Sequence, residues 1–325
     1  MDHAAELAGP RGILLTTDAD GRVAPDWVAA NLAAIAEGAD AVAGCAEIEP
    51  IGARLIPAHL HAIDARECAY AALLDEIRWL LDPDPADPWV RHDEHSGASI
   101  AVTVEAYRRA GGIPPVSLAE DRAFFDRLRC VDAKIRHAPG VRVIVSARIV
   151  GRAPGGMADT MRRRMVQVDE LLDERLEPAR DAARRAWLRA RLQRAWRFAG
   201  HSRRDRGCSG GRWIPAFAGM TGVAGTGMRM TRMAEMGVPS GQLGSADIGG
   251  LAVRLGMAAD DLAMLITSQY FGAAWASVEN RSPILQRRRV RLADLPAQTE
   301  YARRLRDGLR RAANPAGTLL RVAAE

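Results

Sequence analysis

Two aspartates, Asp18 and Asp20, are separated by a single residue and directly follow a short apolar run, Ile13–Thr17. This β-prone run is typical of a strand buried on both faces, and side chains at the carboxyl end of such a strand enter the crevice where α/β folds bind ligands. Two carboxylates held this close repel each other, and a divalent cation would relieve the repulsion. Mg²⁺ and Mn²⁺ prefer oxygen ligands, commonly one or two carboxylates together with water and substrate phosphates. The spacing therefore fits a nucleotide-diphosphate ligand. Asp-Ala-Asp-Gly is also good turn chemistry, and the tripeptide alone favours an ordinary turn.

A second carboxylate pair, Glu120-Asp121, begins an expected helix that extends to Arg129. A carboxylate within hydrogen-bond reach of a reacting hydroxyl is a competent general base. Acidic residues in a first helical turn also interact favourably with the helix dipole, so the pair has a structural explanation too. The two explanations are compatible, and both stay open.

The elements that would position these residues alternate between strand and helix signals over the first 150 residues. After the 13–17 strand, a helix is expected from Pro25 to Gly38, with Val28, Leu32 and Ile35 at helical spacing. Residues 41–43 form the next expected strand, which completes a βαβ unit and predicts a parallel or mixed sheet. Further along, the pattern predicts a long helix over 59–81, a strand over 99–104 and an edge strand over 141–145.

Composition divides the chain into four regions. We expect a catalytic core over 1–157, an Arg-rich helical segment over 158–200 that is interrupted at Pro178, and a small α-helical region over 241–325. Between the last two lies a Gly- and Met-rich stretch, 201–240, which has no periodicity and is expected to be a low-complexity insertion.

An ordered series of motifs surrounds the two carboxylate pairs and strongly resembles the family 2 glycosyltransferases. The resemblance covers roughly residues 12–165, about half of the chain, and it depends on the order of the motifs more than on any one of them. The motifs are Thr17-Asp18-Ala19-Asp20, Pro25-Asp26-Trp27, Gly38-Ala39-Asp40-Ala41-Val42-Ala43-Gly44, His95-Ser96-Gly97-Ala98-Ser99-Ile100-Ala101, Gly111-Gly112-Ile113-Pro114, Glu120-Asp121-Arg122, Ser146-Ala147-Arg148 and Gly151-Arg152-Ala153-Pro154-Gly155-Gly156.

The resemblance implies roles for individual residues on the donor side. Asp20 would coordinate the Mg²⁺ or Mn²⁺ bound to the donor diphosphate, while Asp18 would face the donor sugar or ribose and assist the metal. Arg148 and Arg152 could pair with phosphates, although a solvated arginine is the commoner outcome in a chain this rich in arginine.

On the acceptor side, Asp121 matches the position of the family's general base, with Glu120 beside it. Gly97, Ala98 and Ser99 would line the acceptor pocket, or they form an ordinary tight turn into a strand. His95 and His137 are candidates for extra metal ligands, but a histidine beside a strand is more often a hydrogen-bonded structural residue.

The resemblance implies a GT-A-like α/β fold, with a mixed, mostly parallel sheet flanked by helices and followed by an α-helical C-terminal region. The family's opening apolar strand and Asn-Glu motif have no counterpart before Gly12, so we expect the N-terminal strands to be missing. Those strands usually hold the base and ribose of the donor. The truncation leaves open an alternative function, that of a catalytically inactive, transferase-like binding protein.

The activity implied is metal-assisted, inverting transfer of a sugar from a nucleotide-diphosphate donor to a hydroxyl-bearing acceptor, which could be a glycan, a lipid or a small molecule. Four cysteines without C-x-x-C spacing indicate neither a zinc site nor a disulfide framework. No signal peptide or membrane-spanning run is recognisable, so a cytoplasmic protein is expected, with peripheral membrane association left open.

The formal charge of +5 suggests a nucleic-acid partner at first sight. The surplus lies in Arg152–Arg206, which holds 15 arginines against 8 acidic residues. There arginines alternate with aspartates and glutamates at i,i+3 and i,i+4 spacing, which is typical of a solvated, ion-paired helix face. A nucleic-acid partner is therefore not favoured.

Overall fold

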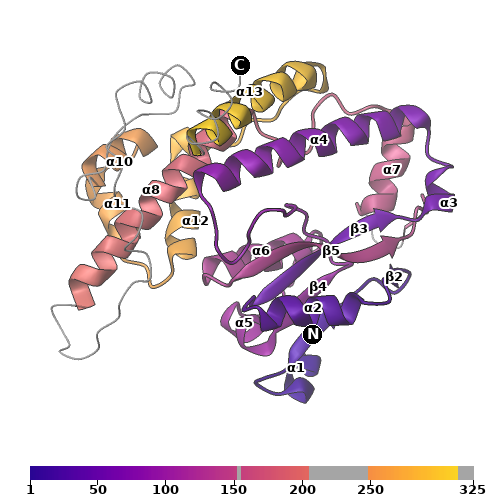
Figure 1. The fold of residues 1–325 in the computed structure, drawn as a ribbon, viewed down its shortest axis with the longest axis horizontal. Helices are drawn as coiled ribbons and strands as arrows, with labels where there is room; N and C mark the ends of the chain where they lie inside the picture. Colours follow the sequence, from indigo (N-terminus) through magenta and orange to yellow (C-terminus); the bar gives the residue numbers. More distant parts are fainter. Residues whose placement is uncertain (152–154, 205–247, 314–325) are drawn as a thin grey trace, which may run out of the picture.

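The computed structural model describes residues 1–151, 155–204 and 248–313, which form a sheet-containing half and a helical half (Figure 1). The sheet has the strand order β1-β4-β3-β5-β2. Its strands are β1 (Ile13–Thr16), β2 (Arg22–Val23), β3 (Ala41–Ile48), β4 (Ile100–Thr103) and β5 (Ile135–Val145).

The sheet is mixed, and the expectation that it is mostly parallel is wrong. Only β3 and β5 pair in parallel, whereas the β1–β4, β4–β3 and β2–β5 pairs are antiparallel. β1 and β3 run in the same direction, as the predicted βαβ unit requires, but β4 lies between them in the opposite direction. A short, mostly apolar strand such as β4 carries no sign of its direction, because the direction is decided by the long 82–99 connection.

Helices cover both faces of the sheet, and side chains alternate between the two faces. On one face lies α2 (Trp27–Ala36), whose Trp27 packs with Val42 and Ala101. The predicted helical spacing misplaces the inner side of α2, because Val28 and Leu32 are exposed. The opposite face is covered by α1 (Asp2–Ala8), α5 (Val104–Arg109) and α6 (Glu120–Cys130).

The helical half is built on the long helix α4 (Ala58–Leu81), which confirms the helix predicted over 59–81. Along it lies α13 (Leu295–Ala313), and α8 (Ala179–Arg204) completes the layer (Figure 1). Tyr70 and Leu74 of α4 belong to the apolar cluster between these helices. A second cluster joins α8 to α10 (Ile248–Leu255), α11 (Ala259–Leu265) and α12 (Phe271–Arg281). The α-helical C-terminal region expected over 241–325 is thus present in its described part.

Short elements complete the structure: α3 (Pro50–Ala53), α7 (Met157–Val166), η1 (Pro283–Leu285) and η2 (Leu292–Asp294). The helical segment expected over 158–200 divides into α7 and α8. An interruption was predicted at Pro178, and α8 begins directly after this residue. Most of the expected insertion at 201–240 lies outside the described residues. Within the described residues no helix has both the length and the apolar character needed to cross a membrane.

Candidate functional site

Asp18 and Asp20 lie in the turn that joins β1 to β2, and both are exposed. The Gly21 N–H donates a hydrogen bond to the Asp18 carbonyl oxygen at 3.0 Å, so the segment does form a turn. β2 then pairs with the C-terminal end of β5, and Arg148 lies in the segment that follows this end. The turn expected from these residues is therefore present, and ligand binding by the two aspartates stays a prediction.

Four carboxylates gather at this position, and we call Asp18, Asp20, Glu120 and Asp121 the carboxylate site. Burial raises the pKa of Asp18, and the negative charges of the other three carboxylates raise it further. Arg148 opposes the shift and forms an ion pair with Asp20 at 2.9 Å. The fold thus brings together two acidic pairs that lie about a hundred residues apart in sequence.

Asp121 is held in place by backbone groups at both of its carboxylate oxygens. Oδ2 accepts a hydrogen bond from the Gly97 N–H at 2.8 Å, and Oδ1 accepts one from the Arg122 N–H at 2.7 Å. Both acidic residues of this pair lie in the first turn of α6, as the sequence predicts. Asp121 therefore connects α6 to the loop that leads into β4.

Of the three small residues assigned to the acceptor pocket, only Gly97 lies beside the carboxylate site. Ala98 is 1% exposed and packs in the core under α2. Ser99 is 0% exposed, and its hydroxyl accepts a hydrogen bond from the Trp27 indole N–H at 2.9 Å. A structural role thus accounts for Ala98 and Ser99 in this conformation. Arg152, the second arginine assigned to phosphate, lies outside the described residues.

His95 and His137 contact each other and not the aspartates of the turn. Their Nε2 atoms are 2.9 Å apart, and His137 Nδ1 lies 2.6 Å from the Asp87 carboxylate. Arg129 approaches the same Nε2 of His95 at 2.6 Å. Burial would raise the pKa of Asp87, but His137 and Arg91 outweigh burial and lower it. These partners make the two histidines part of a buried hydrogen-bonded chain.

A shallow hollow with a mixed lining adjoins Asp20 and Arg148. It lies between the end of β5 and α3, and Ser146 and Ala147 of the Ser146-Ala147-Arg148 motif contribute to it. The sequence analysis did not identify the other lining residues, which are Arg22, Glu49, Gly52, Leu55, Ile144 and Val145. Glu49 caps α3 by accepting hydrogen bonds from the Ile51 and Gly52 N–H groups at 3.0 and 2.6 Å.

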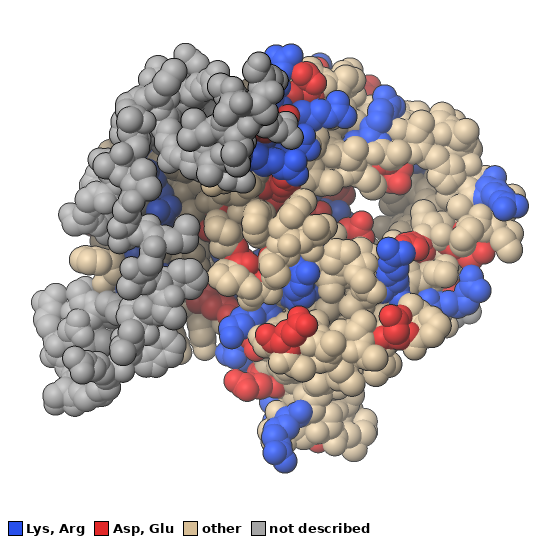
Figure 2. Space-filling view, viewed as in Figure 1, with Lys and Arg blue, Asp and Glu red and all other residues tan. Residues whose placement is uncertain are grey.

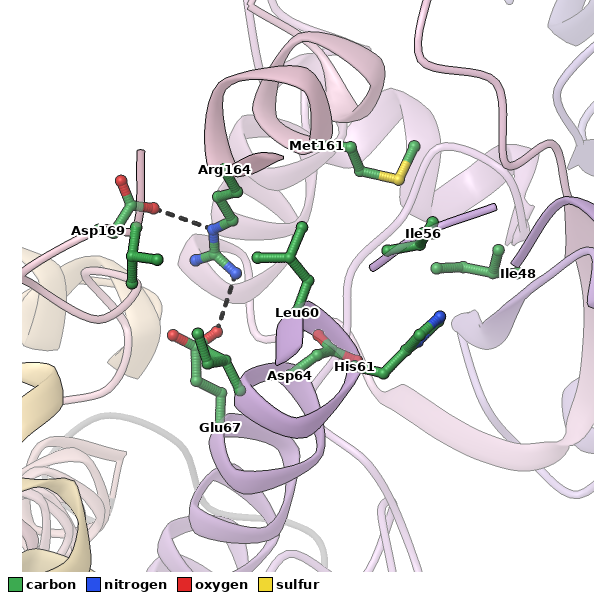
Figure 3. A pocket seen from close by; sticks show the side chains of 11 residues that line it. Ile48, Ile56, Leu60, His61, Asp64, Glu67, Met161, Arg164 and Asp169 are labelled. Carbon is green, nitrogen blue, oxygen red and sulfur yellow. Dashed lines mark hydrogen bonds and ion pairs between the residues drawn. The ribbon is translucent and has the colours of Figure 1, made fainter. Parts of the chain in front are cut away.

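A second, more apolar pocket lies on the other side of α3, between the end of β3, the start of α4 and α7 (Figure 3). Leu60, Ile56 and Met161 form part of its wall. At one end Arg164 donates hydrogen bonds to Asp169 at 2.9 Å and to Glu67 at 3.1 Å. Burial raises the pKa of Glu67, although Arg164 opposes the shift. Because the lining comes from several elements, no local motif could have revealed this pocket.

The surface shown in Figure 2 carries intermixed positive and negative side chains, with no continuous basic stripe over the described residues in this view. Ion pairs such as Arg142–Glu47, at 3.2 Å, and Arg288–Asp181, at 2.6 Å, occur among the described residues. Non-specific nucleic-acid binding depends on clustered cations that track phosphates. The visible face does not have that arrangement.

Comparisons of this chain with family models, with curated proteins and with solved structures found no match. The chemistry of the site must therefore be argued from its own residues. Four carboxylates with one arginine can bind a divalent cation together with an anionic ligand, and a carboxylate fixed at both oxygens can accept a proton.

Proposed function

We propose that this protein transfers a sugar from a nucleotide-diphosphate donor to a hydroxyl acceptor by an inverting displacement that requires Mg²⁺ or Mn²⁺. The observation that carries the proposal is that Asp20, Glu120 and Asp121 all lie close enough to Asp18 for their charges to raise its pKa. Like charges are costly to hold together, so a protein that does so has a use for them. The ordered motifs that resemble family 2 glycosyltransferases favour the same activity.

Asp20 and Asp18 would hold the cation, and the donor set fits a hard metal because it consists of carboxylate oxygens. The raised pKa of Asp18 is consistent with this fit, because a positive ion would relieve the repulsion that raises it. When bound, the cation would neutralise the negative charge that develops on the leaving diphosphate. Arg148, now paired with Asp20, is placed to bind a phosphate in the same hollow.

Asp121 would accept the proton from the attacking acceptor hydroxyl. Its two backbone hydrogen bonds orient the carboxylate and leave the remaining lone pairs of its oxygens for a substrate. Gly97, which donates one of these bonds, lies where the acceptor would approach. The negative charge of Glu120 lies next to Asp121, the proposed base, and so disfavours the binding of a further anion beside that base.

The apolar pocket of Figure 3 would hold a hydrophobic part of the acceptor. One ion pair and one charge effect lie between the pocket and the carboxylate site. Arg122, next to Asp121, lies 3.8 Å from Asp173, and the charge of Asp173 raises the pKa of Glu67 at the pocket. An acceptor that used this pocket would need an apolar portion.

The test is calorimetric titration of nucleotide-diphosphate sugars with and without Mn²⁺, followed by a turnover assay against hydroxyl acceptors. Metal-dependent donor binding is expected for the wild type and for Asp26→Ala, which removes an exposed carboxylate that makes no capping hydrogen bond in α2. Asp20→Ala should lose it. Metal-dependent donor binding that is lost equally in Asp20→Ala and Asp26→Ala, or retained in both variants, contradicts the assignment. Donor binding without turnover supports the alternative of an inactive, transferase-like binding protein.

A further inference from the structure

The pocket of Figure 3 combines an apolar wall with carboxylates. Its apolar side chains come from the end of β3, from α4 and the residues before it, and from α7 and the residues after it: Ile48, Ile56, Leu60, Ile63, Met161 and Val168. Three carboxylates also line it, those of Asp64, Glu67 and Asp169. Among the described residues, Arg164 is the only arginine or lysine in this lining. The lining therefore carries more acidic than basic side chains.

Helical spacing explains why apolar and charged side chains meet here. Leu60, Asp64 and Glu67 follow one another along α4 at intervals of four and three residues, so they share one face of that helix. Met161 and Arg164 are three residues apart on α7 and lie on the opposite wall of the pocket. Each of the two helices thus contributes both an apolar and a charged side chain to the lining.

The carboxylate of Glu67 is buried and incompletely partnered. Glu67 is 9% exposed, and its Oε2 accepts a hydrogen bond from Arg164 at 3.1 Å. Its Oε1 accepts no hydrogen bond from any described residue, while Arg164 also donates to Asp169. Asp64 forms no ion pair within the described part of the chain. A carboxylate in an apolar surrounding is costly unless its oxygens are hydrogen-bonded, so the free oxygen points to a donor supplied by a ligand.

The charges around Glu67 favour a positive ligand. Burial raises the pKa of Glu67, and the negative charges of Asp64 and Asp173 raise it further. Arg164 acts in the opposite direction without cancelling the shift. A cation in the pocket would stabilise the ionised carboxylate, whereas an anion would add another like charge beside it.

We propose that this pocket binds a primary ammonium group carried on a short apolar chain. The ammonium has three N–H donors, which Glu67 Oε1 and the Asp64 carboxylate can accept. The chain lies against Leu60, Ile56 and Met161. The cavity volume is about 80 Å³, and an apolar cavity of about 150 Å³ holds benzene, so the pocket takes about three or four carbon atoms. The site depends on the pocket's own residues and is independent of the proposed sugar transfer.

The experiment is titration of the full chain with three four-carbon probes that differ in charge: n-butylammonium, n-butanol and butyrate. Binding is observed by NMR on protein with carbon-13-labelled methionine methyl groups, and the Met161 signal is assigned by its loss in Met161→Leu. The wild type should bind n-butylammonium at least about tenfold more tightly than n-butanol, because hydrogen bonds to charged groups are the stronger ones. Butyrate should bind more weakly than n-butanol.

Three variants locate the ammonium group. Glu67→Gln removes the charge but can still accept the Arg164 hydrogen bond, so it should bind n-butylammonium about tenfold more weakly and n-butanol as before. Asp64→Asn changes an exposed side chain and should weaken n-butylammonium binding by about two- to fivefold, the range of exposed charge pairs. Glu105→Gln, an exposed residue of α5, is the control and should bind like the wild type.

Several results would overturn the proposal. In the wild type these are a Met161 signal that n-butylammonium does not shift, equal affinity for n-butylammonium and n-butanol, or tighter binding of butyrate. Unchanged n-butylammonium binding in Glu67→Gln also overturns it. If circular dichroism shows that Glu67→Gln does not fold, unchanged binding in Asp64→Asn has the same meaning. An equal loss of binding in Glu105→Gln would show that the preference comes from the overall charge of the protein and not from this pocket.

Discussion

The molecule holds two groups of acidic side chains in opposite electrostatic situations. The carboxylate site in the sheet-containing half has four carboxylates near one arginine, Arg148. In the helical half, Glu177 is 0% exposed and lies 2.9 Å from Arg185, 3.6 Å from Arg78 and 3.9 Å from Arg287. Arg185 also contacts Glu279 at 2.7 Å and Arg78 contacts Asp93 at 3.3 Å, so every carboxylate of this buried ion cluster has an arginine partner.

The pKa shifts have opposite signs in the two places. Burial and like charges raise the pKa of Asp18. Burial would also raise the pKa of Glu177, but the hydrogen bonds and charges of its arginines outweigh burial and lower it. A compensated buried charge is explained by the architecture of the helices, whereas like charges that are only partly compensated are common at ligand-binding sites. The contrast predicts that substitutions in the first group affect activity and those in the second affect stability.

The largest effect is expected for Asp121→Asn. Removal of the proposed general base should lower kcat by about 10²–10⁴-fold. The free energy of unfolding should fall by only about 0.5–1.5 kcal/mol, because the asparagine oxygen can still accept the Gly97 N–H while its NH2 group cannot accept the Arg122 N–H. Asp126→Asn, an exposed residue of the same helix, is the matched control and should keep its turnover. Equal turnover in the two variants would remove Asp121 from the mechanism.

Glu177→Gln should be the most destabilising change in the buried ion cluster. Breaking a buried pair by neutralising one partner costs about 3–5 kcal/mol, because the arginines lose their counter-charge. Glu174→Gln, on an exposed side chain, should cost little in the same urea titration. Since the pKa of Glu177 is lowered in the folded state, its contribution is complete above pH 4.5 and is lost as the pH falls below that value. The difference between wild type and Glu177→Gln should therefore shrink on acidification.

Gly272→Ala tests the contact between the two halves. Asp132 accepts hydrogen bonds from the Phe271 and Gly272 N–H groups, each at 2.7 Å, and so caps α12 from the turn after α6. A Cβ atom at Gly272 would overlap the Arg129 carbonyl oxygen. We expect a loss of about 1–3 kcal/mol by overpacking. Gly140→Ala, where a Cβ meets no neighbour, should be nearly neutral. A neutral Gly272→Ala would mean that the halves are not held together here.

We expect the smallest effect on the free energy of unfolding for Asp18→Asn. The informative result is whether this substitution stabilises or destabilises the protein. The folded state raises the pKa of Asp18, so the ionised carboxylate costs stability, and this cost appears as the pH rises above 3.8. At neutral pH the variant should be more stable than wild type by less than about 1 kcal/mol, the range of exposed charge pairs. Below pH 3.8 the gain should vanish. A loss of stability at neutral pH would show that Asp18 is held by favourable contacts, like Glu177.

Local sequence patterns predicted many of the elements. The 59–81 helix, the strand before Asp18 and the interruption of the Arg-rich helical segment at Pro178 all correspond to observed features, because periodicity and proline act over short range. The direction of β4 and the inner face of α2 could not be predicted in this way. Both depend on which neighbours the chain meets after long connections, as the burial of Trp27 in place of Val28 shows.

The sequence alone identified Asp18, Asp20, Glu120 and Asp121 as candidates, because carboxylate pairs at the ends of apolar strands and helices are recognisable locally. Their proximity, the core position of Ser99 and the contact between His95 and His137 were decided by the tertiary structure. Charge repulsion and ligand geometry act through space over a few ångströms. Residues far apart along a chain acquire such relations only when the sheet and its loops bring them side by side.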